Sequence, residues 1–163
     1  MKDNAYTNVI LLACGAASGK SEYLEYALSN VNSIIYDSTL SALDAAKIKV
    51  RNSLKKKKNV KLVCVIPDSL YRSFLAFINR ERQYPVKRFF ATHAGCRSVV
   101  LTLLSRYPEI EIEIIESYTE DSKIRFRRKE FANRIEVADY LQGLQMTSNQ
   151  IEKQIQEHIS NEI

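Results

Sequence analysis

The chain has 163 residues, 45% of them hydrophobic, with only four glycines and three prolines, which suits a protein with a buried core and excludes disordered and collagen-like chains. Its net charge of +5 is uneven, since residues 1–50 carry −1, residues 51–106 carry +11 and residues 107–163 carry −5. The longest apolar run, residues 9–14, is far below the roughly 18 residues of a membrane span, and three cysteines without a CxxC spacing favour neither disulfides nor a zinc site.

Apolar patterning predicts strands and helices in alternation. A continuous apolar run predicts a buried strand over 8–13, and shorter runs predict further strands over 33–36 and 60–66. A helix is expected after each strand, the third opened by Pro67 with Asp68 as its N-cap. Residues 93–106 form another predicted helix, and the alternation of Glu and Ile over 109–116 predicts an exposed or edge strand. Two helices, over about 130–142 and 147–161, complete the chain.

Alternating strands and helices predict an α/β fold with a parallel sheet. We expect one cytoplasmic domain over residues 1–163, with its core over about 8–118 and a C-terminal helical segment over about 130–161. In that segment Ile151, Ile155, Ile159 and Ile163 recur at steps of four. Packing against the domain is the favoured role for this stripe, and a dimer contact is the alternative.

The segment between the first strand and the first helix matches the phosphate-binding motif GxxxxGK[ST], except that Cys14 replaces the first glycine. Successive backbone amides of such a loop point at phosphate oxygens, and the helix N-terminus adds positive potential. Lys20 is placed to reach the β- and γ-phosphates, and Ser21 to bind Mg²⁺. The nucleotide-binding residues are therefore predicted to be Gly15, Ala16, Ala17, Ser18, Gly19, Lys20 and Ser21.

The alternative for this loop is a strand-to-helix turn that binds nothing. At the first motif position, Cys14 limits backbone freedom wherever a positive φ is needed, and Gly15 is then available for the tight turn. A reactive thiol at Cys14 is a minor alternative.

Asp37 and Thr39 follow the second strand, at the edge of an open α/β sheet where ligands bind. Phosphoryl transfer needs a carboxylate there, either to accept the proton of the acceptor hydroxyl or to hold the metal and its water. We therefore predict Asp37 as a catalytic and metal-binding residue, and both residues as contacts to the acceptor substrate. The alternative is that residues 37–39 cap the next helix.

Arg80, Arg82 and Arg88 lie within nine residues after the third strand. Cations in such a segment neutralise the charge that spreads over the γ-phosphate while the segment excludes water. A solvated helix end is the alternative. Residues 55–58 are four lysines at the opposite end of the sheet, without interleaved aromatic residues, and we expect them to be solvated rather than bound to nucleic acid.

The order of these features resembles the zeta toxin family of P-loop kinases and its polynucleotide-kinase-like relatives. The resemblance covers about residues 8–118 and is carried by 13–21 (Ala-Cys-Gly-Ala-Ala-Ser-Gly-Lys-Ser), 34–39 (Ile-Ile-Tyr-Asp-Ser-Thr), 63–67 (Val-Cys-Val-Ile-Pro) and the arginine segment 79–88. It implies a three-layer P-loop NTPase fold, ATP or GTP with Mg²⁺, and Arg80 and Arg88 as a γ-phosphate clamp. Nucleotide kinases often have a base-contacting loop after the last strand, and by similarity to them Arg125, Arg127 and Arg128 are expected in such a loop.

One departure concerns the substrate side. The family usually has two strands between the phosphate-loop helix and the strand before the lid, the first bearing the catalytic Asp, and here only one lies between Ser21 and Val60. Either the general base is missing or Asp37 has taken its role. The sheet is then expected to have about four parallel strands in the order 2-1-3-4.

The leading functional prediction is a phosphotransferase that moves the γ-phosphate of ATP to a hydroxyl of a small molecule, such as a sugar nucleotide or nucleoside. One alternative is a degenerate nucleotide-binding module that binds a partner protein without transfer, and another is a polynucleotide-end kinase. An antitoxin is one such partner, whereas nucleic acid and membranes are not favoured.

Overall fold

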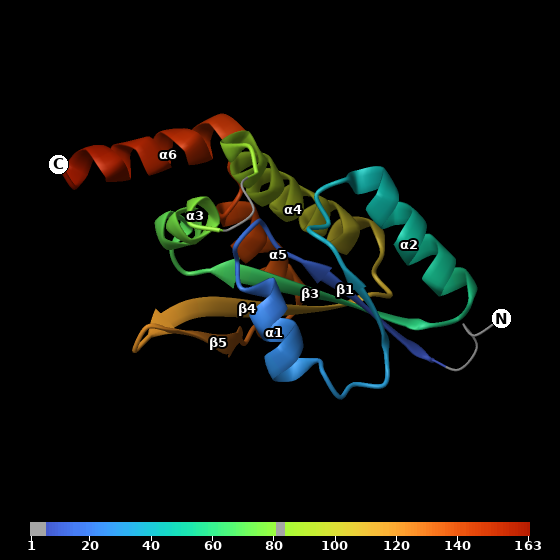
Figure 1. Ribbon diagram of the computed structural model, residues 1–163. Coiled ribbons are helices and arrows are strands. Elements are labelled where there is room, and N and C mark those ends of the chain that lie inside the picture. The colour runs from blue at the N-terminus through green and yellow to red at the C-terminus, as the bar shows by residue number, and fades with distance from the viewer. Residues whose placement is uncertain (1–5, 81–83) are drawn as a thin grey trace.

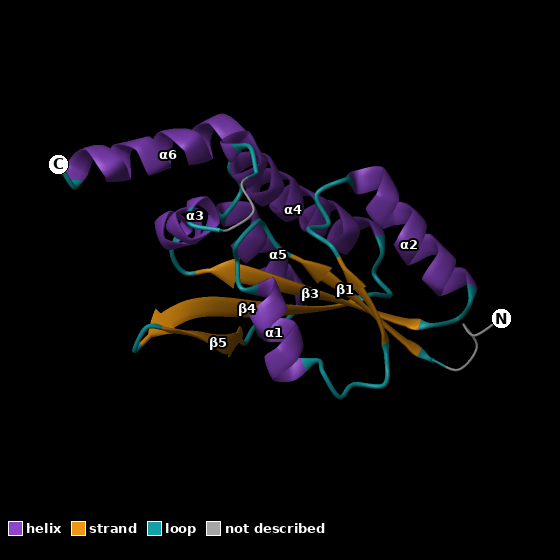
Figure 2. Ribbon diagram, in the orientation of Figure 1, coloured by secondary structure: helices purple, strands orange, loops and turns teal. Residues whose placement is uncertain are grey.

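The computed structural model describes residues 6–80 and 84–163, and its five strands form one sheet in the order β2-β1-β3-β4-β5 (Figure 2). They span Asn8–Ala13 (β1), Ile34–Asp37 (β2), Asn59–Pro67 (β3), Glu111–Glu120 (β4) and Lys123–Lys129 (β5). Strands β1 to β4 are parallel, and β5 runs antiparallel to β4. The predicted α/β fold and the order 2-1-3-4 of its parallel strands are confirmed, and a fifth strand extends the sheet.

The helices lie on the two faces of the sheet, as Figure 1 shows. Helix α1 (Lys20–Ala27) packs on one face, against the side of the strands that carries Leu12 and Val63. On the other face, Leu11 and Leu62 pack against α2 (Leu43–Lys55), α4 (Val86–Arg106) and α5 (Arg134–Gly143). Helices α3 (Leu70–Ile78) and α6 (Ser148–Asn161) pack with the first turns of α4 in a separate, phenylalanine-rich cluster.

The edge of the sheet differs from the prediction. Strand β4 lies between β3 and β5, so the expectation of an edge strand over 109–116 was wrong, and both Ile114 and Ile115 are buried because they face opposite layers. Asp121 and Ser122 join β4 to β5 with φ of 51° and 61°, which is the conformation of a two-residue hairpin turn. The following residues form a strand rather than a loop because they pair with β4 along its whole C-terminal half.

Two helix starts also differ. Helix α4 begins at Val86 and not near residue 93, so Pro85 is its N-cap and the helix is longer than predicted. The N-cap of α3 is Ser69, whose hydroxyl accepts a hydrogen bond from the amide of Arg72, whereas Asp68 forms an ion pair with the Arg72 guanidinium at 2.9 Å. The predicted cap was therefore one residue too early.

The C-terminal isoleucines divide into two pairs. Ile151 and Ile155 are buried in the cluster that α6 forms with α3 and α4, which confirms packing against the domain for this half of the stripe. Ile159 and Ile163 are exposed. Among the described residues, no helix combines the length and the apolar character needed to cross a membrane.

The lysine run is only partly solvated. Residues 55–57 are exposed, as expected, but Lys58 is buried and its ammonium group donates a hydrogen bond to the carbonyl of Tyr6. Lys58 therefore ties the segment before β1 to the start of β3.

Candidate functional site

Residues 14–19 join β1 to α1 in the strand–loop–helix context that the motif requires. Ala17 and Gly19 adopt the left-handed region, with φ of 58° and 90°. Cys14 and Gly15 do not, so the tight part of the loop lies further along the chain than expected. No side chain caps the N-terminus of α1, which leaves its first amides available to an anion.

Distant residues hold this loop in place. The Ala16 amide donates to Thr92 Oγ1 at 3.1 Å, the Ala16 carbonyl lies 2.8 Å from His93 Nε2, and the buried Ser117 hydroxyl donates to the carbonyl of Ser18 at 2.8 Å. These partners are 76, 77 and 99 residues away in the sequence. Sequence reasoning missed all three, because no local pattern around residues 92, 93 or 117 marks them.

The Cys14 thiol is buried at the end of β1. Burial raises its pKa to about 12, because this effect is larger than the lowering of the pKa by the nearby Lys20 ammonium. Since the thiolate is the nucleophilic form, this thiol stays protonated and unreactive at neutral pH. A reactive role for Cys14 is therefore not supported.

Asp37 lies beside the phosphate loop. Strand pairing aligns it with Leu12, near the end of β1, and its Oδ1 is 2.6 Å from the ammonium nitrogen of Lys20. The N-cap of α2 is Ala42, and no side chain bonds to the start of that helix, so residues 37–39 do not cap it. The structure thus brings Asp37 and Lys20 together, and the Thr39 hydroxyl is 3.0 Å from that of Ser41.

A cavity of about 210 Å³ lies between the phosphate loop and the segment from α3 to α4. Arg80 and Arg88 line it opposite the loop, and the Arg88 guanidinium stacks on the Tyr84 ring at 4.3 Å. Arg82 lies outside the described residues. The full lining comprises Gly15, Ala16, Ala17, Ser18, Lys20, Ser21, Glu22, Thr39, Phe77, Arg80, Tyr84 and Arg88. Residues predicted from three separate segments therefore line one cavity, whereas the predicted residues Gly19 and Asp37 are not among its described lining residues.

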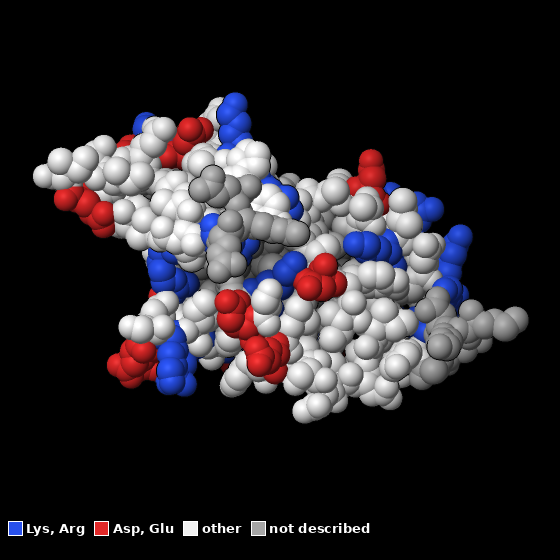
Figure 3. Space-filling view, in the orientation of Figure 1, with Lys and Arg blue, Asp and Glu red and all other residues white. Residues whose placement is uncertain are grey.

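The charges around this cavity are asymmetric. Three cations, Lys20, Arg80 and Arg88, face one carboxylate, Glu22, among the described lining residues. In Figure 3, acidic side chains gather over α1 and basic side chains lie in the hollow between α1 and α3. A cation-rich cavity with a backbone of small residues suits an anion such as a phosphate chain.

The metal prediction rests on two oxygen donors. Among residues 6–80 and 84–163, no group of three or more His, Cys, Asp or Glu side chains is arranged to hold a metal ion. Ser21 lines the cavity. The Asp37 carboxylate lies 2.6 Å from the ammonium group of Lys20, which is another lining residue, so the hydroxyl and the carboxylate predicted as metal ligands are both nearby. This set fits Mg²⁺, which usually takes one or two protein ligands together with phosphate oxygens and water.

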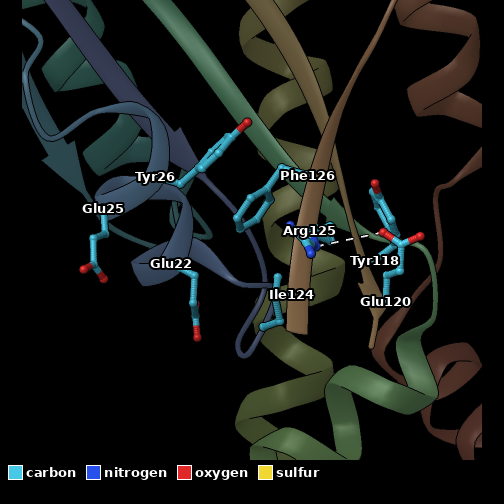
Figure 4. A pocket seen from close by; sticks show the side chains of 8 residues that line it. All are labelled: Glu22, Glu25, Tyr26, Tyr118, Glu120, Ile124, Arg125 and Phe126. Atoms are coloured by element: carbon cyan, nitrogen blue, oxygen red, sulfur yellow. Dashed lines mark ion pairs between the residues drawn. The ribbon is translucent and has the colours of Figure 1, made fainter. Parts of the chain in front are cut away.

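A second cavity, of about 490 Å³, lies between α1 and the β4–β5 hairpin (Figure 4). Tyr26 and Phe126 meet in it, with ring centroids 5.6 Å apart and planes at 29°. Glu22 lines both cavities, which makes them neighbours. Arg125 also lines this cavity and lies 3.9 Å from Glu120.

The arginines after β4 were expected in a loop. Arg125, Arg127 and Arg128 instead belong to strand β5, and each lies in an ion pair with a glutamate, among which Arg127 pairs with the nearly buried Glu116. The base-contacting loop is therefore corrected to a strand, because antiparallel pairing with β4 orders the segment.

Comparison with known proteins identifies similar folds and no family. No protein-family model matches the chain, and no curated protein matches its sequence. Crystal structures of the complex AvrRxo1-ORF1:ORF2 are similar to it: the native form has a TM-score of 0.56 at 10% identity, the form with sulphate ions 0.58 at 11%, and the form with ATP 0.59 at 10%. In the same order, the similarity covers 86%, 90% and 90% of this chain but only 65%, 66% and 66% of those chains.

Proposed function

We propose that this protein is a zeta-toxin-like phosphotransferase that moves the γ-phosphate of ATP or GTP to a hydroxyl of a small molecule, such as a sugar nucleotide or nucleoside. The observation that carries the proposal is the cavity in which the phosphate loop and Lys20 face Arg80 and Arg88. Support also comes from the similar structures, one of which was determined with ATP and another with sulphate ions.

In this proposal Lys20 binds the β- and γ-phosphates, and the two arginines neutralise the charge that develops on the transferred group. Phosphate oxygens compete with Asp37 for the Lys20 ammonium, which frees the carboxylate to accept the proton of the acceptor hydroxyl. Thr39, at the same edge of the cavity, orients the acceptor. Arg82, which lies outside the described residues, is also predicted from the sequence to contact the acceptor substrate.

Mg²⁺ is the proposed metal cofactor, held by the Ser21 hydroxyl, with the Asp37 carboxylate beside the water molecules of its coordination shell. When bound with the nucleotide, it supplies further positive charge to the phosphate chain. The cavity between α1 and the β4–β5 hairpin is the proposed place of the nucleotide base, because it adjoins the phosphate cavity at Glu22 and presents the Tyr26 and Phe126 rings.

Incubation with γ-labelled ATP, Mg²⁺ and a panel of nucleosides, sugar nucleotides and 5′-hydroxyl oligonucleotides tests the transfer. We expect label in one class of acceptor, and we expect Lys20→Ala to abolish it. Lys55→Ala is the matched control, because Lys55 is exposed at the end of α2. Labelled oligonucleotide alone would favour the polynucleotide-end kinase, and no label above the Lys20→Ala level would reject transfer.

A specific observation favours one alternative, a nucleotide-binding module without transfer that engages an antitoxin or other partner protein. Asp37, the carboxylate proposed as the general base, forms an ion pair with Lys20 at 2.6 Å. If this ion pair persists when nucleotide binds, the carboxylate is not free to accept a proton. If transfer occurs, Asp37→Asn should abolish it with little loss of ATP affinity, since the amide keeps the shape and loses the basicity. If the wild-type protein binds ATP and transfers nothing to any acceptor, the binding module is the better description.

A further inference from the structure

Helix α4 contacts the phosphate loop with two consecutive residues. Thr92 Oγ1 accepts from the Ala16 amide at 3.1 Å, and His93 Nε2 lies 2.8 Å from the Ala16 carbonyl. Ala16 belongs to no helix or strand, yet both of its backbone polar groups have a partner in the same turn of α4. The orientation of the two peptide units that flank Ala16 is therefore set by this helix.

The protonation of both partners is determined by their surroundings. The Thr92 hydroxyl donates to the carbonyl of Phe89 at 3.2 Å, which leaves its oxygen lone pairs for the Ala16 amide. Burial lowers the pKa of His93 to about 4, so the ring is neutral at physiological pH. Because a carbonyl oxygen only accepts, Nε2 of this neutral ring carries the proton and donates it to Ala16.

The His93 ring also supports the loop sterically. A Cβ atom on Gly15 would lie 2.3 Å from two of its ring atoms, so the loop backbone rests directly on the imidazole. The ring itself is 2% exposed and packs on Phe89 with centroids 4.3 Å apart. Since Phe89 is fully buried among other phenylalanines, the ring has no room to retreat.

The same helix carries Arg88 into the phosphate cavity. Arg88 precedes Thr92 by one helical turn, about 6 Å along the axis at 1.5 Å per residue. Helix α4 thus holds the phosphate loop at Thr92 and His93 and the opposing cation at Arg88. The helix therefore fixes the position of Arg88 relative to the phosphate loop.

We propose that Thr92 and His93 are positioning residues that hold the phosphate loop in its anion-binding conformation and opposite Arg88. This proposal rests on the proposed function. Neither side chain touches the nucleotide in this assignment. Both act through the Ala16 backbone, so their loss weakens phosphate binding and slows transfer while the fold remains.

Paired substitutions separate this role from simple packing. Thr92→Val keeps the shape and removes the acceptor, whereas Thr92→Ser keeps the acceptor. His93→Leu removes the donor, whereas His93→Gln keeps an N–H donor. Thr102→Val is the matched control on the same helix, because its hydroxyl bonds only to the carbonyl of Ser98 among the hydrogen bonds found for it.

The first measurement is independent of catalysis. Amide hydrogen exchange followed by NMR at Ala16 should accelerate about fivefold or more in Thr92→Val, as expected for one lost buried hydrogen bond, and stay near wild type in Thr92→Ser and Thr102→Val. Unfolding curves recorded in parallel confirm that each variant is folded at the temperature of measurement. An Ala16 amide that exchanges equally fast in wild type and Thr92→Val would overturn the proposal.

The second measurement is nucleotide binding by calorimetry, with ATP and inorganic tripolyphosphate as probes, followed by kcat and KM. We expect about tenfold weaker binding of both probes in Thr92→Val and His93→Leu, with Thr92→Ser and His93→Gln within about threefold of wild type. Wild-type affinity and turnover in folded Thr92→Val and His93→Leu would also overturn the proposal. If the wild-type protein binds neither probe, the proposed function fails, and the exchange experiment still decides whether α4 holds the loop.

Discussion

Replacement of Gly15 by alanine should destabilise the protein through one contact. The added Cβ would lie 2.3 to 2.5 Å from three atoms of the His93 ring, closer than real Cβ contacts allow. Moving the ring costs overpacking energy of about 1–3 kcal/mol and strains the His93–Ala16 hydrogen bond, worth about 1 kcal/mol. We therefore expect Gly15→Ala to lose about 2–4 kcal/mol, which for a chain of this size lowers Tm by roughly 5–15 °C.

Thermal and urea unfolding followed by circular dichroism measure this effect. Gly143→Ala is the matched control: no atom lies within 4 Å of its added Cβ at the end of α5, so we expect no loss of stability. In a His93→Ala background the ring is absent, and Gly15→Ala should cost almost nothing. Gly15→Ala with wild-type Tm, or with an equal cost in both backgrounds, would refute the steric reasoning.

Three further predictions concern groups outside the proposed chemistry. Arg134 donates hydrogen bonds to the carbonyls of residues 104, 107 and 110, so Arg134→Ala should cost about 2–3 kcal/mol in urea unfolding, and the exposed Arg106→Ala much less. Burial lowers the pKa of His93 from 6.5 to about 4, so the unfolded chain binds a proton between these pH values and the folded protein does not. The free energy of unfolding should therefore be highest above pH 6.5 and fall by up to about 3 kcal/mol as the pH drops to 4. That fall should be missing in His93→Gln, and an identical pH profile in both proteins would contradict the assignment. Cys14 should react with iodoacetamide only in denaturant, and mass spectrometry that finds it alkylated within minutes in the native protein would disprove its inertness.

The parallel sheet was predictable because each buried strand is a contiguous apolar segment. Residues 9–13 read as a strand from sequence alone, since a strand that is covered on both faces needs apolar side chains at every position. Strand β5 escaped prediction because basic residues occupy most of its positions, and only pairing with β4 makes it a strand. Its partner β4 was placed at the edge for the same reason: the strand that covers it was not foreseen.

The phosphate loop and its helix are local features. A run of small residues followed by Gly19-Lys20-Ser21 is enough to predict the loop, because the backbone conformation and the positive helix terminus arise from adjacent residues. The place of Asp37 at the edge of the sheet that carries the phosphate loop also follows from the sequence, since neighbouring parallel strands end at the same edge. Its ion pair with Lys20 is known only from the structure.

Tertiary packing alone decides what surrounds that loop. Thr92, His93 and Ser117 contact the loop from segments 76 or more residues away. Nothing in their spacing along the sequence predicts these contacts. Even the requirement for glycine at position 15 is set by the His93 ring and not by backbone conformation. A motif made of adjacent residues can be recognised in the sequence. The hydrogen bonds from α4 and β4 to the loop depend on how these elements pack, so they are known only from the tertiary structure.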